Sequence, residues 1–387
     1  MPSPTRPSQK ILSLDIEGRM SEALETRRGK NAYRILPVEN DLVDFCSNDF
    51  LGFARSNEFR DRILRFEEAY VRYPVGATGS RLVSGNHALY EKVETQVAKF
   101  HRAASGLIFN SGYTANTGLF SCLPQAGDTV IHDALIHPSV ADGIRSGPGI
   151  GMPFKHNDSD DLAANLEVAG GPCLVAVNSV YSMDGDCCPL PEILEVCERA
   201  GAPLIVDEAH ATGVIGPGGR GLVCEEGLEE RILARVHTFG KAMGSHGAII
   251  LGSPTLISYL TNFSAPLIYS TALALHTLLS IKAGYELLGA DQRCLEKLRG
   301  NIEFFSREAP PSVKERLIPS RSAIQCVLLP GNDRAMAAAS KCGDSGYDVK
   351  AVLHPAVPRG RERIRICLHA YNSYKEMRGI LRVLAGC

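Results

Sequence analysis

The segment Leu204–His210 carries two side chains that could do chemistry, Asp207 and His210. The three apolar residues Leu204–Val206 predict a buried strand, and Asp207 follows where that strand ends. In open α/β folds, functional groups gather at the carboxyl ends of the strands. An ordinary strand-to-loop boundary with a helix-capping Asp would give the same pattern. Asp207 and His210 form only a pair of potential ligands, so we do not predict a metal site.

A second segment, Thr238–Gly244, places Lys241 among small residues and glycines, so that its side chain can reach into a cleft. A buried lysine has a lowered pKa and can form a Schiff base. The alternative is a surface lysine on a turn. The spacing G-x4-G-K-[ST] of a nucleotide-binding loop is absent, which disfavours ATP.

In a third segment, Phe109–Asn116, a strand is expected to turn through Ser111 and Gly112 into the start of a helix. The free amides and the dipole of a helix N-terminus suit a phosphate. A plain capped helix is again the alternative.

The three segments together indicate one chemistry. Pyridoxal phosphate needs an anchor for its phosphate, a carboxylate at its ring nitrogen and a lysine at its aldehyde. The chain offers these as the helix start at Gly112, then Asp207, then Lys241. The sequence therefore predicts a pyridoxal 5'-phosphate site, in which the carboxylate keeps the pyridine protonated so that the ring accepts electrons from a substrate carbanion.

From about Ser47 to its last residue, the chain resembles the α-oxoamine synthases, which are fold-type I pyridoxal-phosphate enzymes. The resemblance implies an α/β fold of the aspartate aminotransferase type, with a large domain on a mostly parallel sheet and a smaller C-terminal α+β domain. It rests on nine ordered motifs: SNDFLG (Ser47–Gly52), GATGSRLVSGNH (Gly76–His87), NSGYTAN (Asn110–Asn116), HDALIHPS (His132–Ser139), KHND (Lys155–Asp158), VYSMDGD (Val180–Asp186), VDEAHATGVIGPGGRG (Val206–Gly221), TFGKAMGSHG (Thr238–Gly247) and IYST (Ile268–Thr271).

The resemblance also implies roles around the cofactor. Lys241 would hold the aldehyde and later move the substrate proton, Asp207 would pair with the pyridine nitrogen, and His137 would stack on the ring. His210 would hydrogen-bond the ring hydroxyl, with Ser182 nearby. Both histidines could polarise the thioester carbonyl. The phosphate would be held by Ser111, Gly112, Tyr113 and Thr238.

The same resemblance implies a homodimer with shared active sites. Ser270 and Thr271 would reach the phosphate bound by the partner subunit, and Asn48 would also lie at that shared site. Arg365, in Arg363-Ile364-Arg365-Ile366, would bind the amino-acid carboxylate through a bidentate pair. The alternative for Arg365 is a surface arginine on an edge strand.

The reaction implied is a decarboxylating condensation of an L-amino acid with an acyl thioester on CoA or an acyl carrier protein, which gives a 2-amino ketone. Among family members the chain most resembles 8-amino-7-oxononanoate synthases, which makes pimeloyl-CoA the first acyl donor to consider. Ser80 leaves room for a β-carbon and favours alanine or serine over glycine. Arg34 could meet a distal carboxylate, or could be a solvated basic residue.

Three alternative hypotheses compete with this predicted reaction. The first is a relative from specialised metabolism that condenses serine, alanine or glycine with a carrier-bound polyketide or fatty acyl chain. The others are a non-catalytic subunit, and transaminase or retro-aldol chemistry on the same fold. The sequence departs from the family pattern at three residues that are expected to flank the mouth of the site: Asn178 in place of an acid, Ala356 and His369. Because of these departures, the resemblance does not identify the acyl donor.

These side chains need elements to position them. From about residue 90, short apolar strands alternate with helices, which predicts a mainly parallel sheet. We expect an N-terminal arm at 1–45 with a helix over Ile11–Arg28, a large domain at 46–275 and a small domain at 276–387. The strands expected are Ser105–Asn110, Thr129–His132, Leu174–Val177, Leu204–Val206, Ala248–Leu251, Ala323–Leu329, Val349–Leu353 and Ile364–Leu368.

Composition and charge indicate which partners and which cellular compartment to expect for this protein. With 387 residues, 41 Lys plus Arg and 43 Asp plus Glu, the formal charge is −2, which disfavours a nucleic-acid partner. The 12 scattered Cys fit a reducing compartment. The first residues lack the apolar core of a secretory signal, and no run of about 18 apolar residues occurs, so we expect a cytoplasmic protein that does not enter a membrane.

Overall fold

The computed structural model describes residues 15–30, 33–36, 38, 41–71 and 74–387. Contacts divide the chain into two compact units, Met1–Asp41 and Leu42–Cys387. In the first unit, helix α1 (Ile16–Gly29) begins after Asp15, whose carboxylate accepts a hydrogen bond from the amide of Gly18 at 2.8 Å. All side chains of α1 are exposed. The predicted arm helix is confirmed from residue 16 onward, and residues 11–14 of that prediction lie outside the described residues.

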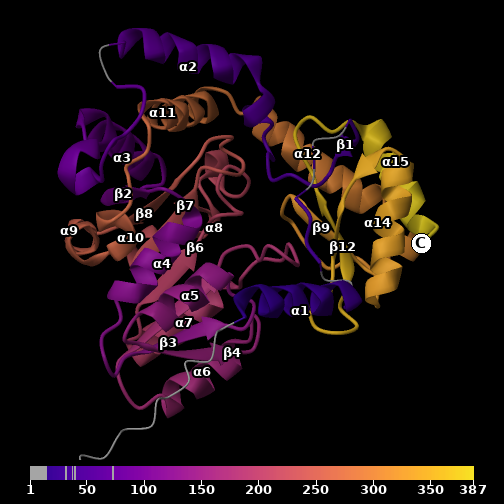
Figure 1. Cartoon of the computed structure of the whole chain (residues 1–387), viewed down its shortest axis with the longest axis horizontal. Helices are drawn as coiled ribbons and strands as arrows, with labels where there is room; N and C mark the ends of the chain where they lie inside the picture. Colours follow the sequence, from indigo (N-terminus) through magenta and orange to yellow (C-terminus); the bar gives the residue numbers. More distant parts are fainter. Residues whose placement is uncertain (1–14, 31–32, 37, 39–40, 72–73) are drawn as a thin grey trace, which may run out of the picture. The chain divides into compact units, whose positions relative to one another are not determined.

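A seven-stranded sheet forms the centre of the second unit, in the order β2-β8-β7-β6-β5-β3-β4 (Figure 1). Neighbours from β4 to β7 pair in parallel, and β8 runs antiparallel to both β7 and β2. The mostly parallel sheet predicted from the sequence is therefore confirmed. Its strands are β2 (Ser105–Phe109), β3 (Thr129–Asp133), β4 (Ile150–Phe154), β5 (Cys173–Asn178), β6 (Leu204–Asp207), β7 (Ala234–Thr238) and β8 (Ala248–Gly252).

Both faces of this sheet are covered, as expected for parallel strands. Successive residues enter different cores: Val175 and Val177 of β5 join one apolar cluster, and Ala176 joins the other. The first cluster includes residues of α2 (Asn57–Ala69), α3 (Ala88–Phe100), α6 (Ser159–Val168), α7 (Leu190–Ala200) and α11 (Leu275–Ala290), and it continues through the C-terminal part of the chain as far as Leu384. The helices of the second cluster are α4 (Gly112–Cys122), α5 (Pro138–Ser146), α9 (Pro254–Phe263) and α10 (Ala265–Ile268).

A second, antiparallel sheet has the order β11-β12-β9 and lies with α12, α14 and α15 (Figure 1). Its strands are β9 (Ile324–Leu328), β11 (Lys350–Val352) and β12 (Arg363–Cys367), and the helices are α12 (Arg293–Glu308), α14 (Asn332–Asp344) and α15 (Tyr374–Ala385). Short β1 (Val43–Asp44) pairs in parallel with β10 (Tyr347–Asp348). All strands of this sheet follow residue 276, and the division into a large domain at 46–275 and a small domain at 276–387 stays a prediction.

Shorter elements connect these layers. They are the 3₁₀ turns Phe53–Arg55, Pro217–Gly219 and Glu229–Arg231, the π turn Arg81–Gly85, and the helices α8 (Leu222–Glu225) and α13 (Pro311–Lys314). All 12 cysteines are free thiols. Among the helices of the described ranges, none is long and apolar enough to cross a membrane.

Candidate active site

The carboxyl end of β6 presents Asp207, which is 8% exposed and pairs in register with Asn178 of β5 and Val236 of β7. Its carboxylate has a fixed direction because two donors bind it. The amide of Ala209 donates to Oδ1 at 2.9 Å, and Nδ2 of Asn116 donates to Oδ2 at 2.7 Å. A short strand of apolar residues thus delivers a buried, oriented anion to the edge of the sheet.

Asn116 links this carboxylate to His137. Its Nδ2 also lies 3.0 Å from Oγ of Ser139, and that hydroxyl lies 2.7 Å from Nδ1 of His137, the residue that caps α5. Burial lowers the pKa of His137, while the charge of Asp207 acts in the opposite direction and that of Lys241 adds to the lowering. The imidazole is therefore neutral near pH 7.

Lys241 follows β7 and meets His210, with 2.8 Å between Nζ and Nε2. Burial is the main reason that the pKa of Lys241 falls to about 8; the charge of Asp207 raises it, and that of Arg365 lowers it. Burial also holds the pKa of His210 well below its ordinary value, and Nδ1 of this imidazole is buried without a partner. A pKa of about 8 gives Lys241 a larger neutral, nucleophilic fraction near pH 7 than an ordinary lysine has, which suits an attack on a carbonyl.

The start of α4 lies beside the end of β7. Ser111 caps the helix through a capping box with Thr114, which leaves the first-turn amides of Gly112 and Tyr113 free of helix partners. A Cβ built on Gly112 would lie 3.6 Å from Oγ1 of Thr238. The Tyr113 side chain turns to the surface, where its hydroxyl donates to Asp142. Free amides at a helix start are suited to bind an anion, and the Thr238 hydroxyl beside them donates to the carbonyl of Gly247 at 3.2 Å.

Arg365 brings three predicted residues together. Its Nε donates to the carbonyl of Ser182 at 2.7 Å, and its Nη2 donates to Oδ1 of Asn48 at 3.0 Å. It lies on β12, the middle strand of its sheet. The alternative of a surface arginine on an edge strand is therefore wrong, because β9 and β11 flank β12 on its two sides.

Ser80, Ser270 and Thr271 form a separate group. Ser80 and Thr271 pair as an isolated antiparallel bridge, and Asn110 donates to the carbonyl of Thr271 at 2.8 Å. In the part of the chain that the structure describes, no hydrogen bond joins this group to Lys241 or Asp207. Arg34 is exposed and belongs to the unit Met1–Asp41.

The three departures from the family pattern differ in environment. Asn178 is 3% exposed and its Oδ1 has no hydrogen-bond partner. Ala356 is exposed. His369 was expected at the mouth of the site but is 0% exposed: its Nδ1 lies 3.0 Å from Oδ1 of Asn372, and its Nε2 lies 3.0 Å from the carbonyl of Ser47. The expectation of a place at the mouth is wrong for both Asn178 and His369, because both side chains are buried, and the His369 ring is enclosed in a hydrogen-bonded core.

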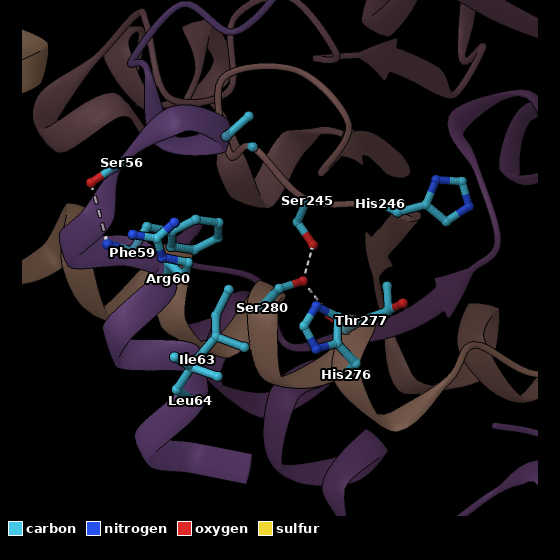
Figure 2. A pocket seen from close by; sticks show the side chains of 12 residues that line it. Ser56, Phe59, Arg60, Ile63, Leu64, Ser245, His246, His276, Thr277 and Ser280 are labelled. Carbon is cyan, nitrogen blue, oxygen red and sulfur yellow. Dashed lines mark hydrogen bonds between the residues drawn. The ribbon is translucent and has the colours of Figure 1, made fainter. Parts of the chain in front are cut away.

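A cavity of about 450 Å³ lies next to the loop that carries Lys241. Figure 2 shows Ser245 of that loop pointing toward Ser280 of α11, to which it is hydrogen-bonded, whereas the His246 ring points away from the α2 residues that line the cavity. The described residues that line this cavity include none of the predicted site residues. The predicted site residues around Lys241 are therefore brought together by their hydrogen bonds, and they do not line this cavity.

Sequence reasoning assigned no role to Asn116 or Ser139, which join Asp207 to His137. Both lie inside recognised motifs, Asn110–Asn116 and His132–Ser139, so their positions could have been singled out. Their polarity on helices that cover a sheet was the available signal, since a buried amide or hydroxyl needs a partner.

Comparisons with known proteins agree with this geometry. A profile of the aminotransferase class I and II family matches residues 40–384. The chain belongs to this family. It is 41% identical to the 8-amino-7-oxononanoate synthase of Emericella nidulans, over 95% of this chain and 94% of that protein. It is 30% identical to the aminoacyl transferase sphA of Byssochlamys spectabilis, over 97% of this chain and 85% of that protein.

A solved serine palmitoyltransferase with pyridoxal phosphate as its internal aldimine superimposes on this family member with a TM-score of 0.87 and 25% identity, over 96% of this chain and 98% of the other. These relatives confirm the resemblance to α-oxoamine synthases and the fold-type I transferase architecture.

Proposed function

We propose that this enzyme binds pyridoxal phosphate and joins an L-amino acid, with alanine the first choice, to an acyl thioester with loss of carbon dioxide, as an 8-amino-7-oxononanoate synthase does. The observation that carries the proposal is the meeting of Lys241 with His210 at 2.8 Å beside a buried, oriented Asp207. The 41% identity to an 8-amino-7-oxononanoate synthase supports the substrate class.

The residues fit the cofactor. Nδ1 of His210 and Oδ1 of Asn178 are buried without partners, which indicates that a bound group completes their hydrogen bonds. The start of α4 and Thr238 would hold the phosphate, Asp207 the pyridine nitrogen and His137 the ring face. When bound, pyridoxal phosphate supplies a protonated ring that withdraws electrons from the substrate Cα.

The protein groups would then divide the remaining work. Arg365 would bind the amino-acid carboxylate, with Ser182 and Asn48 fixing the direction of the guanidinium. Lys241, with its pKa lowered to about 8, would remove the proton from the substrate Cα. His210, at 2.8 Å from that amine, and His137 are the candidates to polarise the thioester carbonyl.

The assembly proposed is a homodimer with shared sites. Ser270 and Thr271 would contact the phosphate bound by the partner subunit, and Asn48 would lie near the same junction. Ser80, paired with Thr271, would then border the space for the amino-acid side chain.

A second candidate is a relative from specialised metabolism that uses a carrier-bound acyl chain. Its support is the 30% identity to an aminoacyl transferase and the exposed Ala356 at a position where the family pattern differs. The two candidates differ in the acyl donor, whereas both use the same cofactor and reaction type.

The test is a matrix of glycine, alanine and serine against pimeloyl-CoA and longer acyl thioesters, read by thiol release and carbon dioxide. We expect release of both only when amino acid and thioester are present, with alanine and pimeloyl-CoA fastest. Lys241→Ala should lose the visible absorbance of the bound cofactor and the activity. Carbon dioxide without thioester, or an unchanged spectrum in Lys241→Ala, would overturn the proposal.

A further inference from the structure

Residues 179–188, the 179–188 loop, begin beside Asp207. The amide and hydroxyl of Ser179 both bind the carbonyl of Asp207, at 2.9 and 3.2 Å. Val180 and Cys187 then pair as a bridge, so that the loop folds back on itself like a short hairpin. The base of the loop is therefore fixed to the strand end that carries the predicted cofactor carboxylate.

The tip of the 179–188 loop is fixed to the second sheet. Arg365 binds the carbonyl of Ser182 at 2.7 Å, and the neighbouring Arg363 binds the carbonyl of Met183 at 3.1 Å and forms an ion pair with Asp184. Gly185 fits tightly, since a Cβ there would lie 2.2 Å from the carbonyl of Ile324 and its φ is +80°. The loop thus supplies one of the two oxygen acceptors that direct Arg365, the other being Oδ1 of Asn48.

A histidine connects this loop to another part of the site. Nε2 of His156 lies 2.8 Å from Oδ2 of Asp186, and Nδ1 lies 2.9 Å from Oδ1 of Asp133. Its ring meets the Tyr181 ring edge-on at a centroid distance of 4.4 Å. Asp133 is 0% exposed, so a cation between the two carboxylates is strongly favoured there.

Asp133 also shapes the turn that leads to His137. Its Oδ1 accepts the amide of Leu135 at 2.7 Å, and its carbonyl accepts the amide of Ile136 at 3.0 Å. His156 therefore contacts two segments of the chain: the turn that leads to His137, through Asp133, and the 179–188 loop that binds Arg365, through Asp186.

A metal ion is a poorer explanation of this cluster. Ligand atoms of His156, Asp184 and Asp186 lie within 4.8 Å of one another. However, both ring nitrogens of His156 already contact carboxylates, and Asp184 is paired with Arg363. The charged groups facing the ring, Asp133, Asp186, Asp184 and Arg363, carry three negative charges against one positive charge, so an imidazolium improves the balance.

We propose that His156 is a positioning residue, which as an imidazolium holds Asp186 against Asp133 and so keeps the 179–188 loop in the place where Arg365 is directed at the substrate carboxylate. The inference rests on the proposed function. It assigns to His156 no contact with substrate or cofactor. Its consequence is specific: losing the ring should weaken the binding of amino acids through their carboxylate and leave the amine and cofactor contacts in place.

The test compares L-alanine with L-alaninamide, which lacks the carboxylate, as ligands of the cofactor-loaded enzyme. Dissociation constants are measured by the change in cofactor absorbance in the wild type, in His156→Gln and in Lys155→Gln. The last variant is the control, because Lys155 is the residue next to His156 and pairs with Asp161, outside the 179–188 loop. Melting temperatures and the cofactor dissociation constant are recorded for each protein.

For His156→Gln we expect the alanine dissociation constant and KM to rise about tenfold or more, since small misplacements of a binding group are costly. The alaninamide and cofactor constants and kcat should change less than about threefold. Equal weakening of both ligands would show a purely structural role, and unchanged alanine binding would also refute the inference. If His156→Gln does not fold, Asp186→Asn replaces it with the same criteria. A wild type that binds no amino acid would instead refute the proposed function.

Discussion

Asp207 shows how much of the candidate site depends on single hydrogen bonds. The carboxylate is buried, and each of its oxygens has one donor, Ala209 or Asn116. A buried anion with a missing partner is destabilised far more than a neutral group, so its surroundings must be complete before any ligand arrives. Asn116 is therefore as informative about the site as the residues that would touch the cofactor.

Replacing Asn116 with alanine tests this point. The change removes the donor to Oδ2 of Asp207 at 2.7 Å and should weaken pyridoxal phosphate binding about tenfold, since a hydrogen bond to a charge contributes roughly 1.5–3 kcal/mol. The cofactor dissociation constant is measured by absorbance titration. Ser139→Ala, which keeps this donor, is the matched control and should have a smaller effect. Equal constants for the two variants would contradict the prediction.

At the scale of elements, the strands around the site were predictable where they are apolar. Leu204–Val206 and Leu174–Val177 each lie within a buried parallel strand, and a polar residue follows at the predicted end. Strand β7 was missed because Arg235 and His237 break its apolar pattern. Their hydrogen-bond partners come from distant parts of the chain and cannot be predicted from the local sequence. Arg235 donates to the carbonyl of His101 at 2.8 Å, and Nδ1 of His237 lies 2.9 Å from Oγ1 of Thr212.

Strand β4 was missed for a different reason. Ile150–Phe154 lies at the edge of the sheet and contains Gly151 and Pro153, which sequence rules associate with turns. An edge position tolerates both residues, but only the sheet order reveals that position. The central place of β12, and with it the support of Arg365, likewise follows from long-range pairing with β9 and β11 and not from local sequence.

The junction of α3 and β7 predicts how stability depends on pH. His101 and His237 are both buried, with ring centroids 3.9 Å apart. Burial lowers the pKa of His101 to about 3, and that of His237 also lies well below its ordinary value. Above pH 6.5 both the folded and unfolded forms are neutral. Below pH 6.5 these two histidines bind protons in the unfolded chain but stay neutral in the folded protein. The free energy of unfolding therefore decreases as pH falls from about 6.5 toward 3.

For His101 alone the loss should be about 3 kcal/mol at pH 4, measured by urea denaturation between pH 7 and 4. His101→Leu should be less stable at pH 7, because the hydrogen bonds to Tyr285 and to the carbonyl of Arg220 are lost. It should nevertheless lose less stability on acidification than the wild type. An identical acid dependence in the two proteins would assign the effect to other groups.

At the scale of the whole molecule, the second unit presents apolar side chains to solvent near Thr271. Val75, Val83 and Tyr269 are 89%, 82% and 85% exposed. Their segments are joined by the bridge of Ser80 with Thr271 and by the amide of Ala272, which donates to the carbonyl of Gly79 at 3.0 Å. Apolar groups gathered in this way are typical of a surface that a partner covers. This patch is where the proposed homodimer would bring Ser270 and Thr271 to the other subunit.

If the two subunits share their active sites, mixing two inactive variants should restore activity, whereas separate sites would stay inactive. Lys241→Ala subunits lack the amine, and Thr271→Asp subunits would place a negative charge against the partner's phosphate, so each homodimer should be inactive. After unfolding and refolding an equal mixture, half of the dimers are hybrids, and each hybrid has one site with neither change. Roughly a quarter of wild-type activity should therefore return. Sedimentation velocity checks that dimers form, and a mixture of Lys241→Ala with Lys241→Arg is the control that stays inactive. A refolded hybrid without activity would mean that each site is built within one subunit, which would contradict the role proposed for Thr271.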